Sequence, residues 1–552
     1  MKIDWRAVQA GVAGRRNVVG AAAVLTIASI VYSQFDLYGH LSRDSAIYIY
    51  GGQRLTQGVP PYASIMDPKG PLSGILCGFG VAIARLLGRD DVLIIRIEFC
   101  ALAIISVLGI YLLVLEMWHS VVAAVVAGAV FVSFRSYAHQ ALMGPEGHAP
   151  GVVFLIFAMW LTASRRWYWA GVAASLAFCS WQPLFTYPIV VVVCALAWTA
   201  GHRLRAVGWT LAGIATPLVA LMVYYALAGY LGSLFTGLFV FPLTSVRRTP
   251  ESEATRFAFI VRNIDNAFQS SAVFLWLGLA LMLVMAAHTV FAARPRWHSA
   301  LASPMILLVL LSFGLHLFYV AYDYIGWTHA FPLLPYAAVG IGAATAYVLD
   351  RLAQPRTQRI VTAVLSAGVA ALTVVYAIVY YEPSTNDAAF ANGIARGKDT
   401  VLRDEEATAC ALQEGIVPDT PLAVLGDPVP LVLLHRVNPD NYPYEGSGLD
   451  VWRVEHTPGG FGGWTSQILA SRASVIVLDA WNGPYRKLMQ HFLSTHGYRR
   501  GYVGTFRVYV TPAAHARMHS RSIKLAEKQY FWPITTDGGT FRITHCTSTS
   551  AG

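Results

Sequence analysis

The sequence is poor in charged residues. Asp, Glu, Lys and Arg make up 13% of its 552 residues, whereas a soluble chain carries about 25%. Hydrophobic residues account for 56% of the chain. This balance excludes an ordinary soluble protein and indicates a polytopic membrane protein. We attribute the formal net charge of +10 to cations that orient membrane helices, and we expect no nucleic-acid partner.

Cysteine is scarce as well, with six residues in the chain. Cys410 and Cys546 lie in the polar C-terminal part. They could pair if that part is extracytoplasmic, but two cysteines make no disulfide framework. The other four lie in apolar runs, where a free thiol behaves as a small hydrophobe: Cys77, Cys100, Cys179 and Cys194.

Metal-binding motifs are missing. His139, Glu146 and His148 are neighbours in the sequence, but they form neither an HExxH motif nor a dense set of ligands. We therefore expect no metal ion and no cofactor. No A-x-A cleavage site follows the first apolar run, so we interpret that run as an uncleaved anchor.

A membrane-spanning helix needs about 20 mostly apolar residues. We interpret about eleven apolar runs as spans: 18–37, 93–115, 121–137, 152–163, 170–181, 184–200, 207–228, 272–293, 305–322, 331–349 and 360–381. The section 170–200 is either one broken span or two. The run 71–87 is shorter and suits a re-entrant or interfacial helix. Arg96 and Glu98, near the outer end of the second run, could pair.

Cations mark the ends of alternate runs. The N-terminal flank and the later Arg-rich turns fall on one side under a single alternation, and the positive-inside rule makes that side cytoplasmic. The same alternation places the segments 40–72 and 230–271, which we interpret as loops, and everything after Glu382 outside. Usage rich in Ala, Gly, Val and Arg favours a bacterial inner (plasma) membrane protein.

After Glu382 the composition becomes that of a water-soluble domain. The pattern predicts strands and one helix: 421–425 (strand), 473–478 (strand), 485–496 (helix) and 501–510 (strand or hairpin). We interpret the glycine-rich segment 459–463 as a loop. The predicted fold is an α-helical polytopic membrane domain, residues 1–382, followed by a soluble α/β domain, residues 383–552.

The segment 40–72 holds two carboxylates and three cations directly beside an apolar run. Charges there are costly, so a functional role is the default interpretation. Transfer of a sugar from a lipid-linked phosphate to a hydroxyl needs a base near the acceptor and cations near the departing phosphate. Asp44 is the candidate base, and Lys69, Arg43 and Arg54 are the candidate phosphate ligands.

Simpler roles exist for the same side chains. Asp44 could cap a helix, although Ser42 is available for that task. Lys69 could extend to lipid head groups. Asp67 could simply pair with Lys69 and have no further role. Glu146 could be an acid at the end of a helix that binds no ligand.

Two further sites have the same ambiguity. Arg247 and Arg248 could bind phosphate or lipid head groups, or belong to a solvated loop. His329 could contact substrate or be a satisfied interfacial histidine.

Five stretches, in this order along the chain, resemble the GT-C glycosyltransferases, in particular bacterial lipid A aminoarabinose transferase and the protein O-mannosyltransferases. They are Asp44 with Tyr48, the DPKGPL segment 67–72, the corner at Glu146, and the segments AGVAASLAFCSWQP (170–183) and YIGWTHAFPLLPYAA (324–338). The chain departs from the family by an inserted proline, by a glycine in place of a proline, and by Gln182 where a lysine is common.

The resemblance implies an extracytoplasmic, metal-independent and inverting transfer of a hexosyl or pentosyl group. The donor would be a polyprenyl-phosphate sugar, and the acceptor a glycan, lipid or protein hydroxyl of the cell envelope. The resemblance implies substrate contacts at Tyr48, Asp67, Glu146, His148, Gln182 and His329. A lipid or polysaccharide transporter (flippase) and a non-catalytic, glycan-binding membrane scaffold are the alternative functions.

Overall fold

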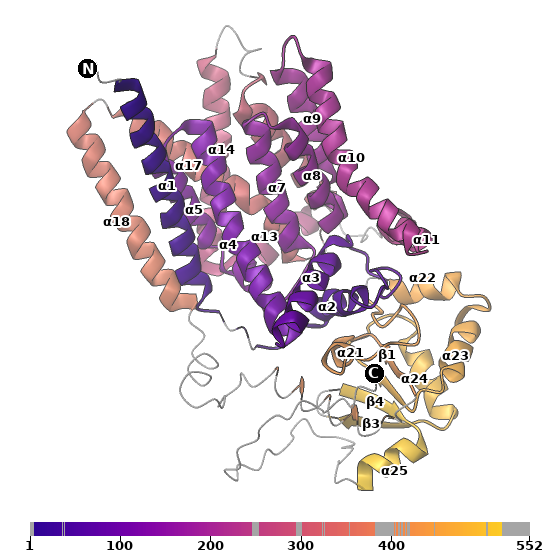
Figure 1. Ribbon diagram of the computed structural model, residues 1–552. Helices are drawn as coiled ribbons and strands as arrows, with labels where there is room; N and C mark the ends of the chain where they lie inside the picture. Colours follow the sequence, from indigo (N-terminus) through magenta and orange to yellow (C-terminus); the bar gives the residue numbers. More distant parts are fainter. Residues whose placement is uncertain are drawn as a thin grey trace.

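The computed structural model (Figure 1) describes most of the chain. The described residues are 5–245 except 36 and 38, 253–293, 301–380 except 323, 325 and 353, separate positions between 402 and 419, and 420–520 except 447, 504 and 505. Arg247, Arg248, Cys410 and Cys546 lie outside these ranges, so their predicted roles stay predictions.

Residues up to 380 form a helical bundle (Figure 1). Its elements are α1 (Trp5–Tyr32), α2 (Arg43–Leu55), α3 (Leu72–Leu87), α4 (Asp91–Trp118), α5 (Val121–Val132), α6 (Arg135–Met143), α7 (His148–Ala163), α8 (Trp167–Ser180), η1 (Gln182–Phe185), α9 (Thr186–Trp198), α10 (Arg203–Leu227), α11 (Leu231–Phe235), η2 (Thr236–Val240), α12 (Phe241–Ser245), α13 (Glu253–Phe268), η3 (Gln269–Ser271), α14 (Ala272–Ala292), η4 (Pro304–Leu310), α16 (Leu311–Tyr322), η5 (Trp327–Leu333), α17 (Leu334–Arg351) and α18 (Pro355–Tyr380).

The bundle is that of a multi-pass membrane protein. Within the described ranges, six helical stretches are long and apolar enough to cross a membrane, or seven if the pair α5 and α6, bent by 63°, is one span. Shorter apolar helices, α3 and α7 among them, accompany these stretches. The number of about eleven spans stays a prediction.

Glycines allow the helices of the bundle to approach closely. A Cβ on Gly278 of α14 would lie 2.3 Å from the carbonyl oxygen of Ala337 of α17. A Cβ on Gly340 of α17 would lie 2.1 Å from the carbonyl oxygen of Gly278. Small residues permit such backbone contact between membrane helices, so α14 and α17 form a tightly packed pair.

The expectation of a long loop at 230–271 is wrong for the part that the structure describes. That part contains α11, α12 and α13. On α13, Ile260, Ile264 and Phe268 are buried and recur every four residues. This spacing places them on one face of a helix, so an amphipathic helix covers the bundle there instead of a loop.

Helices α2 and α3 cover the end of the bundle that lies nearest residues 420–520 (Figure 1). A Cβ on Gly52 of α2 would lie 2.6 Å from Cβ of Cys77 of α3. The glycine therefore allows the two helices to cross in direct contact. Because α2 begins at Arg43, this crossing fixes the position of Asp44 relative to the bundle.

Residues 420–520, the C-terminal region, contain a four-stranded sheet of order β1-β2-β4-β3. Strand β2 pairs parallel with β1, whereas β4 runs antiparallel to both β2 and β3. The elements are β1 (Leu422–Leu425), α21 (Val429–Leu433), α22 (Leu449–His456), α23 (Gly460–Ala470), β2 (Val475–Leu478), α24 (Arg486–Thr495), β3 (Arg499–Val503), β4 (Phe506–Val510) and α25 (Pro512–Ser520).

The expectation of a loop at 459–463 is also wrong, because helix α23 begins at Gly460. Gly459 takes a left-handed conformation with φ +81° at the N-cap. A Cβ on Gly463 would lie 1.9 Å from the carbonyl oxygen of Pro458. The glycines therefore permit a sharp turn and a close contact at the start of a helix, rather than an irregular loop.

Candidate active site

Lys69 lies in a chain of charged groups between α2, α3 and α7. Its Nζ is 3.4 Å from Glu146 Oε1, and Glu146 Oε2 is 3.1 Å from His148 Nδ1. The ammonium group of Lys69 is also 5.9 Å from the centroid of the Tyr48 ring. Glu146 and His148 are buried, whereas the Lys69 side chain is 21% exposed. The structure thus brings four of the sequence-predicted site residues together.

Close backbone packing positions the Lys69 segment. The Tyr62 hydroxyl donates a hydrogen bond to the carbonyl oxygen of Lys69 at 2.6 Å. A Cβ on Gly70 would lie 2.0 Å from the carbonyl oxygen of Cys179 in α8. Gly70 therefore lets this loop rest directly on the end of α8.

The Glu146 corner is held from both sides. The Ser73 hydroxyl, in the first turn of α3, donates to the carbonyl oxygen of Glu146 at 3.3 Å. A Cβ on Gly147 would lie 2.8 Å from the carbonyl oxygen of Ser180 and 3.3 Å from Cδ of Lys69. The small residue at 147 thus gives the Lys69 side chain room to reach Glu146.

Burial and ion pairing set the charges of these groups. Burial disfavours the charged form of Glu146, but Lys69 and His148 outweigh it and hold the pKa of Glu146 well below its usual value. Burial also opposes the charge on Lys69. Nevertheless three carboxylates together raise the pKa of Lys69: Glu146, Asp67 and Asp44. Burial raises the pKa of Asp67 to about 6, although the neighbouring Lys69 opposes the rise.

Asp44 lies in the first turn of α2 but does not cap the helix. Ser42 is the N-cap, and its Oγ accepts a hydrogen bond from the Ser45 N–H at 3.1 Å. The Asp44 carboxylate accepts from Arg43 Nε at 3.1 Å, and its side chain is 42% exposed. Because Ser42 satisfies the helix end, the Asp44 carboxylate is available to a molecule from outside.

A cluster of rings extends from His148 into the bundle. The His148 ring centroid lies 4.5 Å from that of Trp181 and 5.5 Å from that of His329. Trp181 in turn contacts His329 at 5.0 Å and His316 at 6.1 Å. Gln182 follows directly, and its buried Nε2 makes no hydrogen bond to any residue described. His148 therefore connects Glu146 with His329.

The structure does not gather all predicted phosphate ligands around Lys69. Arg43 Nη1 donates to the carbonyl oxygen of Ala480 at 2.6 Å, and its guanidinium lies 5.1 Å from the Tyr444 ring. Arg43 thus connects α2 with the C-terminal region. Arg54 lies ten residues beyond Asp44 on α2, about 15 Å along the helix, where it binds Gln57.

The sequence left open an ion pair between Arg96 and Glu98, and the structure gives Arg96 other partners. Arg96 is fully buried and donates to the carbonyl oxygens of Leu37, Gly39, His40 and Met143 at 2.7–3.1 Å. No ion pair between Arg96 and Glu98 is present. Arg96 therefore ties the segment that leads into α2 to the residue three positions before Glu146. In the sequence, Arg96 stands out only as a cation inside an apolar run.

The C-terminal region is hydrogen-bonded to the segment before Lys69. The Met66 N–H donates to the carbonyl oxygen of Asn441 at 2.8 Å, and Asn441 Nδ2 donates to the carbonyl oxygen of Tyr62 at 3.0 Å. In addition, the Asn438 N–H donates to the Tyr50 hydroxyl at 3.0 Å. Across the described residues, no group of three or more His, Cys, Asp or Glu side chains is placed to hold a metal ion.

No protein-family model matches the chain, and no curated protein matches it. Solved structures do match. ArnT from Cupriavidus metallidurans in the apo state is 14% identical, with a TM-score of 0.56 over 90% of this chain and 98% of that chain. The same protein bound to undecaprenyl phosphate is 15% identical, with a TM-score of 0.56 over 89% of this chain and 97% of that one.

A second match is the archaeal oligosaccharyltransferase AglB from Archaeoglobus fulgidus, in complex with an inhibitory peptide and a dolichol-phosphate. It is 13% identical, with a TM-score of 0.51 over 93% of this chain and 75% of that chain. Identities this low establish the fold alone. The chain has the GT-C fold.

Proposed function

We propose that the protein is a glycosyltransferase that moves a sugar from a polyprenyl-phosphate donor to a hydroxyl of a cell-envelope acceptor. One observation carries the proposal. The partly exposed carboxylate of Asp44 acts electrostatically on the cation of Lys69, and both belong to a chain with the GT-C fold. Two of the matching structures contain a polyprenyl or dolichol phosphate, which supports a lipid-phosphate donor.

Lys69 is the proposed ligand of the donor phosphate. The lysine ammonium has three hydrogen-bond donors, so it can keep Glu146 as a partner while it binds a phosphate oxygen. The pairing with Glu146 holds Lys69 in place and charged. A fixed cation stabilises the negative charge that develops on the phosphate as it leaves.

Asp44 is the proposed general base. The acceptor oxygen attacks the anomeric carbon of the donor sugar and forms the new glycosidic bond. The bond from that carbon to the phosphate oxygen breaks, and its electron pair leaves with the polyprenyl phosphate. Asp44 takes the hydroxyl proton of the acceptor. A single displacement of this kind inverts the configuration of the sugar.

The remaining residues of the site act through these two. Tyr48 lies against Lys69, and His148 pairs with Glu146, so both fix the geometry around the ammonium group. The proposed roles of Asp67, Gln182 and His329 are contacts with the donor or acceptor. Arg43, Arg54, Arg247 and Arg248 remain proposed secondary cations for the donor phosphate.

We also infer the orientation and the domain division. Helix α1 begins at the end of the bundle that lies opposite the C-terminal region (Figure 1). This arrangement supports a cytoplasmic N-terminus and an extracytoplasmic domain over residues 383–552, in the bacterial inner membrane. The Lys69 group lies at the end nearest that domain, which supports transfer on the extracytoplasmic side.

Mass spectrometry of envelope glycans and lipid-linked sugars in a deletion strain tests the function. We expect one glycan modification to disappear and one polyprenyl-phosphate sugar to accumulate. The wild-type gene should restore both, whereas a gene encoding Asp44→Asn should restore neither. If the protein were a flippase, its deletion would leave the lipid-linked sugar on the cytoplasmic side. If it were a scaffold, its deletion would leave the amount of that sugar unchanged. Either result contradicts the proposal.

A further inference from the structure

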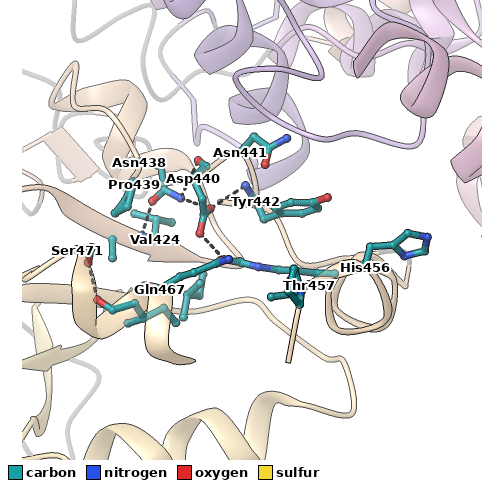
Figure 2. A pocket seen from close by; sticks show the side chains of 15 residues that line it. Val424, Asn438, Pro439, Asp440, Asn441, Tyr442, His456, Thr457, Gln467 and Ser471 are labelled. Atoms are coloured by element: carbon teal, nitrogen blue, oxygen red, sulfur yellow. Dashed lines mark hydrogen bonds and ion pairs between the residues drawn. The ribbon is translucent and has the colours of Figure 1, made fainter. Parts of the chain in front are cut away.

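A cavity of about 410 Å³ lies within the C-terminal region, away from the Lys69 group. Residues of β1, of the segment 438–442 and of helices α22 and α23 line it (Figure 2). Its volume falls in the range of about 300–1,000 Å³ that is typical of small-molecule sites. The activity proposed above gives this cavity no role.

A buried arginine forms one wall of the cavity. Arg453 is 2% exposed, and its Nη1 donates to Glu445 Oε1 at 2.8 Å, while its Nη2 donates to Asp440. Its guanidinium lies 4.3 Å from the Trp464 ring and 5.0 Å from the Tyr442 ring. Two carboxylates and two rings therefore hold the guanidinium in one position.

A second network fixes the segment opposite Arg453. Asp440 Oδ1 accepts hydrogen bonds from Asn438 Nδ2 and from the Tyr442 N–H, both at 2.9 Å. Asn438 Oδ1 accepts from the Val424 N–H of β1 at 2.7 Å. Networks of this kind keep polar side chains rigid, so the cavity is preformed.

The lining indicates the chemistry of the ligand. The ion pair with Asp440 offsets the charge of Arg453, so the cavity offers no excess positive charge to a phosphate or carboxylate. Gln467, Thr457 and Ser471 add amide and hydroxyl groups, and Figure 2 shows Gln467 and Ser471 across the cavity from Asn438. Mixed donors and acceptors without net positive charge fit a molecule rich in hydroxyl groups.

We propose that this cavity binds a neutral saccharide unit of the acceptor glycan. The role of the cavity in the reaction rests on the glycosyltransferase function proposed above, but the binding of a saccharide by the cavity does not. The segment 438–442 that lines the cavity also makes the hydrogen bonds from Asn441 to Tyr62 and Met66. A saccharide in the cavity is thus held by the same segment that supports the loop before Asp67.

Saturation-transfer NMR on the full-length protein in detergent tests the proposal. The probes are neutral disaccharides of mannose, glucose, galactose and arabinose, and inorganic phosphate is the anionic competitor. We expect saturable binding of at least one disaccharide, unaffected by phosphate. Ser471→Trp places an indole in the cavity and should weaken binding at least about tenfold. Ser466→Trp, on the exposed face of α23, the helix that Ser471 follows directly, should not.

Three results would overturn the saccharide site: no disaccharide binds saturably, phosphate displaces the bound disaccharide, or the two tryptophan variants weaken binding equally. The assay involves no transfer, so its outcome is independent of the Asp44 test. Where transfer is measured, Ser471→Trp should raise the KM for the acceptor and leave kcat unchanged. An effect on kcat alone would argue against a role in acceptor binding.

Discussion

Lys69 and Glu146 form an ion pair of 3.4 Å between two loops that are 77 residues apart in the sequence. Each charge stabilises the other, and His148 also supports the charge on Glu146. Glu146 is buried, and only Lys69 and His148 keep its carboxylate ionised. The cation proposed for the donor phosphate therefore depends on a residue that need not touch the donor at all.

Lys69→Met should lower both the stability of the protein and its affinity for the donor phosphate, and a second substitution should separate the two effects. It leaves the Glu146 carboxylate buried without its cation, which costs about 3–5 kcal/mol in comparable pairs. We expect a lower melting temperature in detergent and loss of binding to undecaprenyl phosphate. The double variant Lys69→Met with Glu146→Gln should recover most of the melting temperature but none of the binding. Recovery of binding in the double variant would contradict the role of Lys69.

Asp44→Asn should abolish transfer without unfolding the protein. The carboxylate is 42% exposed, and Ser42, not Asp44, caps helix α2, so little stability depends on it. Loss of the base should lower the rate by at least about 100-fold while the melting temperature stays within error. Glu455→Gln removes an exposed carboxylate from α22 and is the matched control, with transfer at the wild-type rate.

Donor binding should weaken as the pH rises through about 6. The pKa of Asp67 is raised to about 6 by burial, so the group is neutral below that pH and negative above it. An ionised Asp67 beside Lys69 opposes a bound phosphate. Affinity for undecaprenyl phosphate, measured from pH 5 to 8, should fall less steeply in Asp67→Asn than in the wild type. The comparison between the two proteins removes the titration of the phosphate itself. Identical profiles would exclude Asp67 as the titrating group.

Gly70→Ala should displace the Lys69 segment. The new Cβ would meet the Cys179 carbonyl oxygen at 2.0 Å, and such overpacking costs about 1–3 kcal/mol. We expect a lower melting temperature and slower transfer. Gly232→Ala adds the same methyl group in α11, where nothing lies within 4 Å, and should leave both unchanged. Wild-type transfer by Gly70→Ala would contradict the close packing of this loop.

Short-range patterns in the sequence predicted much of the local structure. Strands β1 and β2 lie within the two apolar runs at 421–425 and 473–478, because a buried strand needs only a short run of β-branched and aliphatic residues. Helix α13 was missed although Ile260, Ile264 and Phe268 carry the helical period. The charged residues around them favoured the interpretation as a loop.

The site was less accessible to sequence reasoning. The spacing of Asp44, Tyr48 and Lys69 in a single segment, together with a family resemblance, was enough to select these residues. The contacts of His148 with Trp181 and His329 depend on three separate stretches of chain. Such contacts follow from tertiary packing, which no local pattern encodes. For the same reason, the sequence did not predict the four carbonyl partners of Arg96.

The two hydrogen bonds of Asn441 have a consequence for how this protein can be divided. They tie the segment 62–66 to the C-terminal region, so the two are expected to open and close as one cooperative unit. A chimaera that exchanges the C-terminal region between proteins of this fold would have to exchange the segment 62–66 with it. The proposed acceptor-binding region and the loop that leads to the proposed donor ligand Lys69 would then be inherited together.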